Sequence, residues 1–293
     1  MSCSYRDLYV TASDGLRLYA RDYGPGTDGA LPVVCLPGLA RNSEDFRELA
    51  EALSTDASRP RRVLCLDYRG RGRSEWTADW RQYDLGTELN DLLQVLRAAG
   101  IEKAVFVGTS RGGLLTMALS ATKPMLLAGA VLNDVGPVIE PKGLIRIRSY
   151  VGKLPTPATL QEGAQILKQL SGEQFPAFSP EQWEAMARGT WHEENGRLVL
   201  SYDPNLMKPL QELDLEAPIP ELWNLFAGLA PFPVLVIRGE NSDLLSAETL
   251  AAMQERHPRL AALVVPGQGH APMLQGSIIH AVRDLILTAE AAL

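Results

Sequence analysis

The sequence predicts an α/β fold with a mostly parallel sheet, and three observations support this prediction. Six short apolar runs rich in Val, Leu and Ile recur along the 293 residues, and several end in Gly or Asp. Segments with helical periodicity lie between these runs, and such alternation is typical of βαβ units. From about residue 138 to 229 the alternation is interrupted by prolines, helical patterns and one hairpin signal. We therefore expect helices on both faces of the sheet and a mainly helical cap inserted between two strands.

The strands are predicted first. Two alternating segments flank Asp14-Gly15 at the start of the chain, which indicates a hairpin that supplies antiparallel edge strands. The six apolar runs follow in the order "PVVCLPG", "RVLCLDYRG", "KAVFVGTS", "GAVLNDVGP", "PVLVIRGE" and "AALVVPG". Each run is almost continuously apolar, so each predicts a strand buried on both faces.

Helical patterns separate the strands. They are "NSEDFRELAEAL", "DLGTELNDLLQVLRAAG", "RGGLLTMALSATKP", "SAETLAAMQERHP" and the final "SIIHAVRDLILTAEAAL". Gly100 stands where a helix often ends, and Ser246 stands where one often begins.

The interrupting segment has signals of its own. Ser179, Pro180 and Gln182 occupy the positions of a capping box with proline at the first helical residue. Asn195-Gly196 predicts a second hairpin, and "PELWNLFAGL" predicts an amphipathic helix. We expect a core domain of residues 1–137 and 230–293, with a cap at 138–229.

Composition limits the possible partners and locations. The net charge of −7 argues against non-specific binding of nucleic acid or of anionic membranes. No apolar run approaches the length of a membrane span, and "MSCSYRDLYV" has no secretory signal pattern. Cys3, Cys35 and Cys65 are odd in number and lack metal-ligand spacing, which favours a reducing compartment. We expect a cytoplasmic protein that is a monomer or a homodimer.

Ser110 is the candidate nucleophile. It lies in "VFVGTSRGG", between a predicted strand and a predicted helix, at the edge of a parallel sheet where ligands bind. Gly108 and Gly112 would let the strand and the helix pass close to each other without Cβ clashes. The backbone N–H of Arg111 would then face the reacting atom.

A serine needs a general base, and His270 is the candidate. It follows a predicted strand in the glycine-rich "VVPGQGHAPML", beyond the carboxyl end of the last strand. The other three histidines are His192 in the predicted cap, His257 at a helix end and His280 within the final helix.

The histidine needs a carboxylate to fix its tautomer, and two aspartates are candidates. Asp243 follows the strand beyond the interruption, in the order serine, aspartate, histidine, and is the expected acid. Asp134 follows the strand before the interruption and is the alternative acid. Glu240 and Asp203 are weaker candidates.

The remaining site residues are expected around the first parallel strand and in the cap. The loop "LPGLARN" makes the N–H of Leu39 the second candidate oxyanion donor, beside that of Arg111. Candidate substrate-binding residues are Arg41, Trp183, Met186 and Trp223.

Taken together, "LPGLARNSEDF", "DYRGRGRS", "GTSRGG", "RGENSDLLS" and "VPGQGHAPML" resemble the motifs of the α/β-hydrolase superfamily. The resemblance covers nearly all of the chain outside the expected cap and is strongest to capped bacterial carboxylesterases, some of which accept polyesters. It implies Ser110 as nucleophile, His270 as base and Asp243 as acid. It also implies that Leu39 and Arg111 donate to the oxyanion, and that "DYRGRGRS" is a structural loop.

The expected reaction is hydrolysis of a small-molecule carboxylic ester through an acyl-enzyme. The sequence shows no metal cluster and no dinucleotide-binding loop, so we expect no metal and no cofactor. Three alternatives remain open: a hydrolase that cleaves carbon–carbon bonds in ring-cleavage products, a cofactor-free perhydrolase, and a non-catalytic ligand receptor on the same fold.

Overall fold

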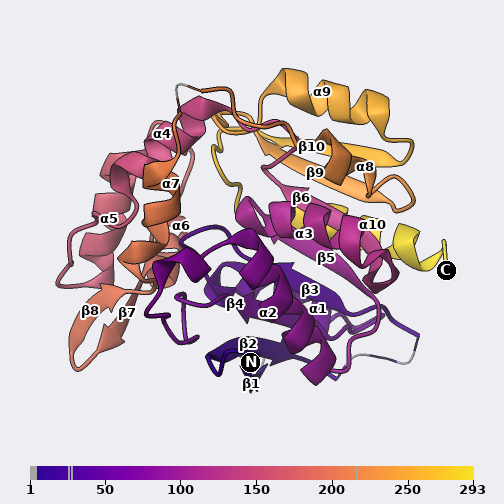
Figure 1. Cartoon of the computed structure of the whole chain (residues 1–293), viewed down its shortest axis with the longest axis horizontal. Coiled ribbons are helices and arrows are strands. Elements are labelled where there is room, and N and C mark those ends of the chain that lie inside the picture. The colour runs from indigo at the N-terminus through magenta and orange to yellow at the C-terminus, as the bar shows by residue number, and fades with distance from the viewer. Residues whose placement is uncertain (1–4, 26, 28, 216) are drawn as a thin grey trace.

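An eight-stranded sheet forms the centre of the computed structural model, which describes residues 5–25, 27, 29–215 and 217–293 (Figure 1). Its strand order is β1-β2-β4-β3-β5-β6-β9-β10. β1 pairs with β2, and β2 with β4, in antiparallel fashion, and all other pairs in the sheet are parallel. The strands are β1 (Tyr5–Thr11), β2 (Arg17–Tyr23), β3 (Val33–Leu36), β4 (Val63–Asp67), β5 (Ala104–Thr109), β6 (Leu127–Asn133), β9 (Val234–Gly239) and β10 (Leu260–Val265). The predicted hairpin and all six predicted strands are confirmed.

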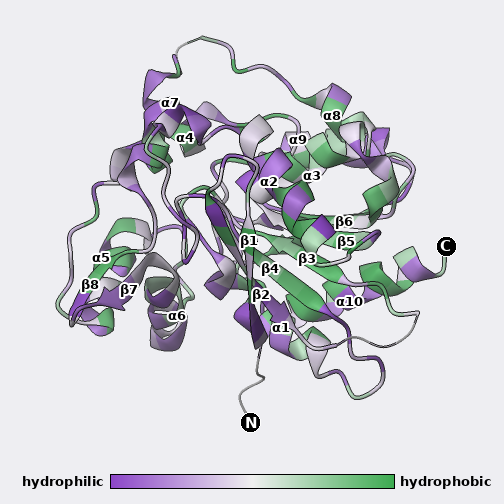
Figure 2. Ribbon diagram, turned by 60° about the horizontal axis from the view of Figure 1, so that its bottom comes forward, coloured by the Kyte–Doolittle hydropathy of each residue, from purple (hydrophilic) through white to green (hydrophobic). Residues whose placement is uncertain are grey.

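Helices cover both faces of the sheet, as predicted. α1 (Arg47–Ser54) and α10 (Ser277–Glu290) share one apolar core with the sheet. The opposite core includes α2 (Leu85–Ala98), α3 (Arg111–Thr122), α8 (Trp223–Ala227) and α9 (Ala247–Arg256). Figure 2 shows the central strands as the most hydrophobic part of the ribbon. Three short 3₁₀ turns connect these elements: η1 (Ser43–Phe46), η2 (Trp80–Gln82) and η3 (Pro124–Leu126). Cys35 and Cys65 are free and buried, whereas Cys3 lies outside the described residues.

One strand differs from its prediction. β10 was expected to be buried on both faces, but Ala261, Ala262 and Val264 are exposed, Val264 by 47%. The reason is its position at the end of the sheet, where it has only β9 as a neighbour. An apolar run of this length has the same pattern in the centre of a sheet and at its edge.

The chain between β6 and β9 leaves the sheet and forms a separate group of elements, seen at the left of Figure 1. These are α4 (Pro141–Tyr150), α5 (Leu160–Ser171), α6 (Pro180–Thr190), β7 (Trp191–Glu194), β8 (Arg197–Leu200), η4 (Pro204–Met207) and α7 (Lys208–Glu212). Of them, only α6 and the β7-β8 hairpin were predicted individually. Ser179 and Gln182 form the expected capping box, and Asn195 has the positive φ of 50° that its hairpin turn requires.

The two ends of this group meet. The N–H of Leu222 donates to the carbonyl of Pro137 at 2.7 Å, so the chain returns to the sheet where it left it. α8 then packs on α3, with Phe226 buried in the sheet core. We call residues 138–221 the insertion. The predicted boundary at 229 remains a prediction, but α8 makes its contacts with the sheet layer.

Candidate active site

Ser110 stands at a sharp turn between β5 and α3. Its φ is 51°, a conformation that costs a non-glycine residue free energy and is found at functional sites. The turn depends on close backbone contacts: a Cβ on Gly108 would lie 2.4 Å from the carbonyl of Gly112. A Cβ on Gly112 would lie 2.0 Å from the carbonyl oxygen of Leu36. The two glycines therefore have the steric role that the sequence predicted.

His270 lies against Ser110. Its Nε2 is 2.9 Å from Ser110 Oγ, and its side chain is 8% exposed. The amide of Asn133, the last residue of β6, donates to the carbonyl of Pro272 at 2.9 Å and so holds the histidine loop against the sheet. The structure thus brings together the predicted nucleophile and the predicted base.

The carboxylate against His270 is Asp134 and not the expected Asp243. Asp134 Oδ2 lies 2.8 Å from His270 Nδ1, and the Asp134 side chain is fully buried. It also accepts hydrogen bonds from the backbone of Gly239 at 2.7 Å and from the hydroxyl of Ser242 at 2.6 Å. Such bonds leave the carboxylate little freedom to turn away from the imidazole.

Topology explains this correction. β6 lies between β5 and β9, so an acid at the end of β6 is next to the strand that carries Ser110. Asp134 directly follows β6, whereas Asp243 is the fourth residue after β9. The signal in the sequence is the position of Asp134 directly after a strand.

Asp243 has a different partner. Its carboxylate binds Arg146 of α4 in a bidentate pair, with distances of 2.6 and 2.9 Å. Burial raises the pKa of this carboxyl, but the hydrogen bonds and charge of Arg146 outweigh it and leave the pKa below its usual value. Asp243 consequently joins the insertion to the sheet domain.

The two weaker acid candidates, Glu240 and Asp203, also have partners other than His270. Glu240 accepts a hydrogen bond from the backbone of Gly267, and Asp203 accepts one from the hydroxyl of Tyr83. Of the other histidines, His192 lies beside Ser201 Oγ, and His257 is buried beside the carbonyl of Leu229.

The two candidate oxyanion donors flank the nucleophile. Arg111 is the first residue of α3, and the first N–H groups of a helix have no acceptor within it. On the other side, a Cβ on Gly38 would lie 3.8 Å from Ser110 Cβ, which places the Gly38-Leu39 peptide next to the serine. The geometry is compatible with two backbone donors that converge on one oxygen.

A cavity of about 180 Å³ opens onto Ser110 and His270, between the sheet domain and the insertion. Arg41 and Met186 line it, as do Leu39, Arg146 and Tyr150. Arg41 is already bonded to Asp45, to Thr190 Oγ1 and to the carbonyl of Met186, so its guanidinium joins η1 to α6.

Two predicted substrate-binding residues lie elsewhere. Within the described part of the chain, neither Trp183 nor Trp223 lines the cavity. Trp183 is buried in the insertion against Phe175 and Phe178, and Trp223 packs on Phe226 beneath Arg256. Their apolar patterns marked core packing, which sequence alone does not distinguish from a pocket wall.

Membrane-spanning helices and metal-binding clusters are both absent from the residues that the structure describes. None of their helices is long and apolar enough to cross a membrane. Among the same residues, no group of three or more His, Cys, Asp or Glu side chains is arranged to hold a metal ion.

The chain is similar to known proteins over most of its length. A sequence profile described as the alpha/beta hydrolase family matches residues 33–279. The 3-hydroxybutyrate-oligomer hydrolase of Cupriavidus necator is 36% identical over 284 residues, covering 93% of this chain and 94% of that protein. A 2-(acetamidomethylene)succinate hydrolase of Mesorhizobium japonicum is 26% identical, covering 80% of this chain and 79% of its own.

A solved structure is similar over almost its full length. The crystal structure of an alpha/beta hydrolase from Novosphingobium aromaticivorans superposes with a TM-score of 0.90 and 42% sequence identity, covering 97% of this chain and 99% of that one. This similarity includes the insertion as well as the sheet domain.

Proposed function

The chain belongs to the α/β-hydrolase family and is a hydrolase of that type, and from this premise we propose that it cleaves carboxylic esters with Ser110 as nucleophile. The hydrogen-bonded series from Ser110 Oγ through His270 to Asp134, with distances of 2.9 and 2.8 Å, is the observation that carries the proposal. A serine, a histidine and a buried carboxylate in this order are suited to acyl transfer.

Acylation begins when Ser110 Oγ attacks the carbonyl carbon of the ester. The proton of the hydroxyl passes to His270 Nε2, and Asp134 stabilises the imidazolium through Nδ1. The backbone N–H groups of Leu39 and Arg111 bind the oxyanion of the tetrahedral intermediate. Collapse of the intermediate expels the alcohol, which takes the proton from His270 and leaves an acyl-serine.

Deacylation repeats these steps with water. His270 takes a proton from the water, whose oxygen attacks the acyl carbon, and the second tetrahedral intermediate forms in the same oxyanion site. Its collapse releases the carboxylic acid and returns the proton to Ser110 Oγ.

For the substrate, we propose short-acyl esters that include oligomers of 3-hydroxybutyrate. The relative from Cupriavidus necator is named for hydrolysis of such oligomers and matches nearly the whole chain. The cavity of about 180 Å³ suits a short acyl group, and we propose that the insertion acts as the cap that selects it. Sites of this kind select by shape and by a few polar groups.

Replacement of Ser110 with Ala tests the proposal. We expect hydrolysis of p-nitrophenyl butyrate and of 3-hydroxybutyrate dimers and trimers to fall by about 10³-fold or more, because only the oxyanion site and binding remain. A fluorophosphonate should label the unchanged enzyme at Ser110 and fail to label the variant. Equal turnover by the two proteins would contradict the assignment of the nucleophile.

The alternatives need results that differ from these. A carbon–carbon hydrolase would need a cation for the carboxylate of its substrate, and Arg146 is already paired with Asp243. A receptor would gain thermal stability on binding its ligand and show negligible turnover on a panel of esters and thioesters. The same panel, with a vinylogous diketone acid added, separates the carbon–carbon hydrolase and the receptor from an ester hydrolase.

A further inference from the structure

A buried carboxylate contacts the supports of both candidate oxyanion donors. Glu88 lies on α2 and is fully buried, with Oε2 2.5 Å from Arg111 Nε and Oε1 2.8 Å from Arg71 Nη1. Arg71 is itself fully buried and lies in the loop after β4. One carboxylate therefore bridges two guanidinium groups that come from different parts of the chain and offsets half of their combined charge.

Each arginine continues to a different side of the oxyanion site. Arg71 Nε donates to the carbonyl of Leu39 at 2.8 Å, and the N–H of Leu39 is one of the two candidate oxyanion donors. Arg111 supplies the other through its own N–H, and its Nη2 donates to the carbonyl of Tyr83 at 3.1 Å. Glu88 thus joins the Leu39 loop to the first residue of α3.

Tyr83 connects the network of Glu88, Arg71 and Arg111 to the insertion. The ring of Tyr83 lies 5.4 Å from the Arg71 guanidinium, and its hydroxyl donates to Asp203 in the insertion at 2.6 Å. Burial lowers the pKa of Arg71, and the charge of Glu88 opposes that effect. Without Glu88, the buried guanidinium of Arg71 would face that of Arg111 with no carboxylate between them, which is costly.

We propose that Glu88 is a positioning residue that sets the separation of the two oxyanion donors through Arg71 and Arg111. The inference rests on the proposed serine-hydrolase function and assigns a role to the Arg111 side chain, which the sequence left without one. Glu88 would affect the stability of the transition state more than substrate binding, because the donors bind the substrate oxygen most strongly when that oxygen carries charge.

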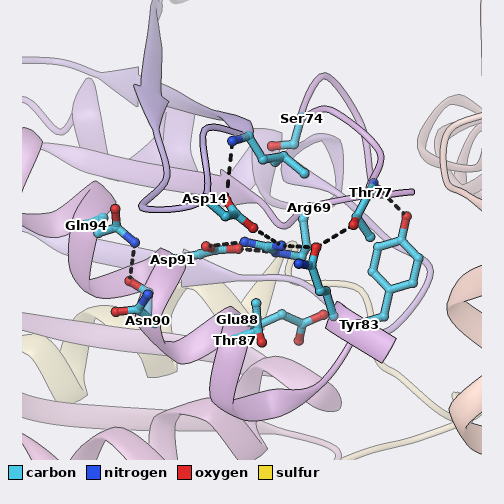
Figure 3. Close-up of polar contacts among 12 residues, drawn as sticks. Asp14, Arg69, Ser74, Thr77, Tyr83, Thr87, Glu88, Asn90, Asp91 and Gln94 are labelled. Atoms are coloured by element: carbon cyan, nitrogen blue, oxygen red, sulfur yellow. Dashed lines mark hydrogen bonds and ion pairs between the residues drawn. The ribbon is translucent and has the colours of Figure 1, made fainter. Parts of the chain in front are cut away.

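A matched control lies one turn further along α2. Asp91 is also a buried carboxylate, bound to Arg69 by two hydrogen bonds of 2.7 and 2.8 Å, but it contacts neither Arg71 nor Arg111 among the described interactions. Figure 3 shows Glu88 and Asp91 on the same helix, with Arg69 bonded to Asp91 and Asp14. Asp91→Asn and Glu88→Gln therefore remove similar charges from the same element.

The experiment compares kcat, KM, melting temperature and the inhibition constant of phenylboronic acid, whose tetrahedral adduct on the serine places an oxygen in the oxyanion site. For Glu88→Gln we expect kcat for p-nitrophenyl butyrate to fall by about tenfold or more, with KM changed less than about threefold. The inhibition constant should rise by about the same factor as kcat/KM falls. Asp91→Asn should lower the melting temperature but change kcat less than about threefold.

The double variant Glu88→Gln/Arg111→Gln adds a second readout. Since both residues act through one network, its loss should be smaller than the product of the two single losses. If Glu88→Gln does not fold, Arg111→Gln decides, because it keeps the backbone N–H and removes one arm of the network. We then expect a several-fold loss in kcat with little change in KM.

The results that overturn the inference are specific. Equal losses of kcat in Glu88→Gln and Asp91→Asn, or an effect of Glu88→Gln confined to KM, would show that Glu88 is only structural. For Arg111→Gln, an unchanged kcat would lead to the same conclusion. An unchanged protein that neither reacts with fluorophosphonate nor hydrolyses esters would instead overturn the proposed function, and this inference with it.

Discussion

At the scale of single residues, the position of the acid separates what the sequence predicts from what it leaves open. The roles of nucleophile and base each have one suitable candidate in the sequence. Ser110 is the serine between a predicted strand and a predicted helix, and His270 is the histidine in the loop after a predicted strand. For the acid there were two aspartates at strand ends, and their order along the chain did not separate them. The deciding quantity is the sheet order, which puts β6 beside β5. Strand pairing between distant segments leaves no trace in local periodicity.

The two aspartates give the first comparison. Asp134→Asn should lower kcat for an ester by about 10³-fold or more, because the amide favours the wrong tautomer of His270. Asp243→Asn should lower it by less than about tenfold, since Asp243 contacts Arg146. Steady-state kinetics on the two folded variants measure both effects. A larger loss in Asp243→Asn would restore that residue as the acid.

At the scale of elements, strands and helices follow from the sequence more directly than the environment of each one. All six apolar runs are strands, and α6 and α9 begin at the expected caps, Ser179 and Ser246. The partly exposed β10 differs from its prediction because apolar residues indicate that an element is packed, but not against what. Trp183 and Trp223 illustrate the same limit among candidate pocket residues.

The turn that carries Ser110 is the element with the least room for change. Gly112→Ala would place a Cβ 2.0 Å from the backbone oxygen of Leu36, which no side-chain rotation relieves. We expect the free energy of unfolding to fall by about 3 kcal/mol, together with loss of activity.

Gly86→Ala is the matched control for this substitution. Gly86 also lies in the first turn of a helix, but its nearest contact would be Asp84 Oδ1 at 3.1 Å. Its unfolding free energy should change by less than about 1 kcal/mol. Urea denaturation of both variants gives the comparison, and similar values for the two would contradict the steric account of the elbow.

At the scale of the whole molecule, the Arg146–Asp243 pair links the insertion to the sheet domain, and its strength should depend on pH. The pKa of Asp243 in the folded protein lies below its usual value of 3.8. The pair therefore contributes its full stabilisation above the unfolded-state pKa and loses it as the pH falls through the folded-state pKa. Between pH 5 and 7 the contribution should be constant.

Melting temperatures from pH 7 down to pH 2.5 check this dependence. The unchanged protein should melt above Asp243→Asn at pH 7, and the difference should shrink below about pH 4 and vanish at the acid end. A difference that persists at pH 2.5 would show that the charge of Asp243 is not what stabilises the contact.

The hydrogen bond between Leu222 and Pro137 brings the two ends of the insertion next to each other in space. The cost of closing a loop depends on the separation of its ends and only weakly on its length. Residues 138–221 can therefore be replaced by a segment from a relative, joined between Pro137 and Leu222, without any break in a strand of the sheet, provided that the segment keeps the contacts of Arg146 with Asp243 and of Asp203 with Tyr83. A library of such chimaeras would vary the residues of the insertion that line the cavity while Ser110, Asp134 and His270 stay the same, so that changes in selectivity trace to the insertion.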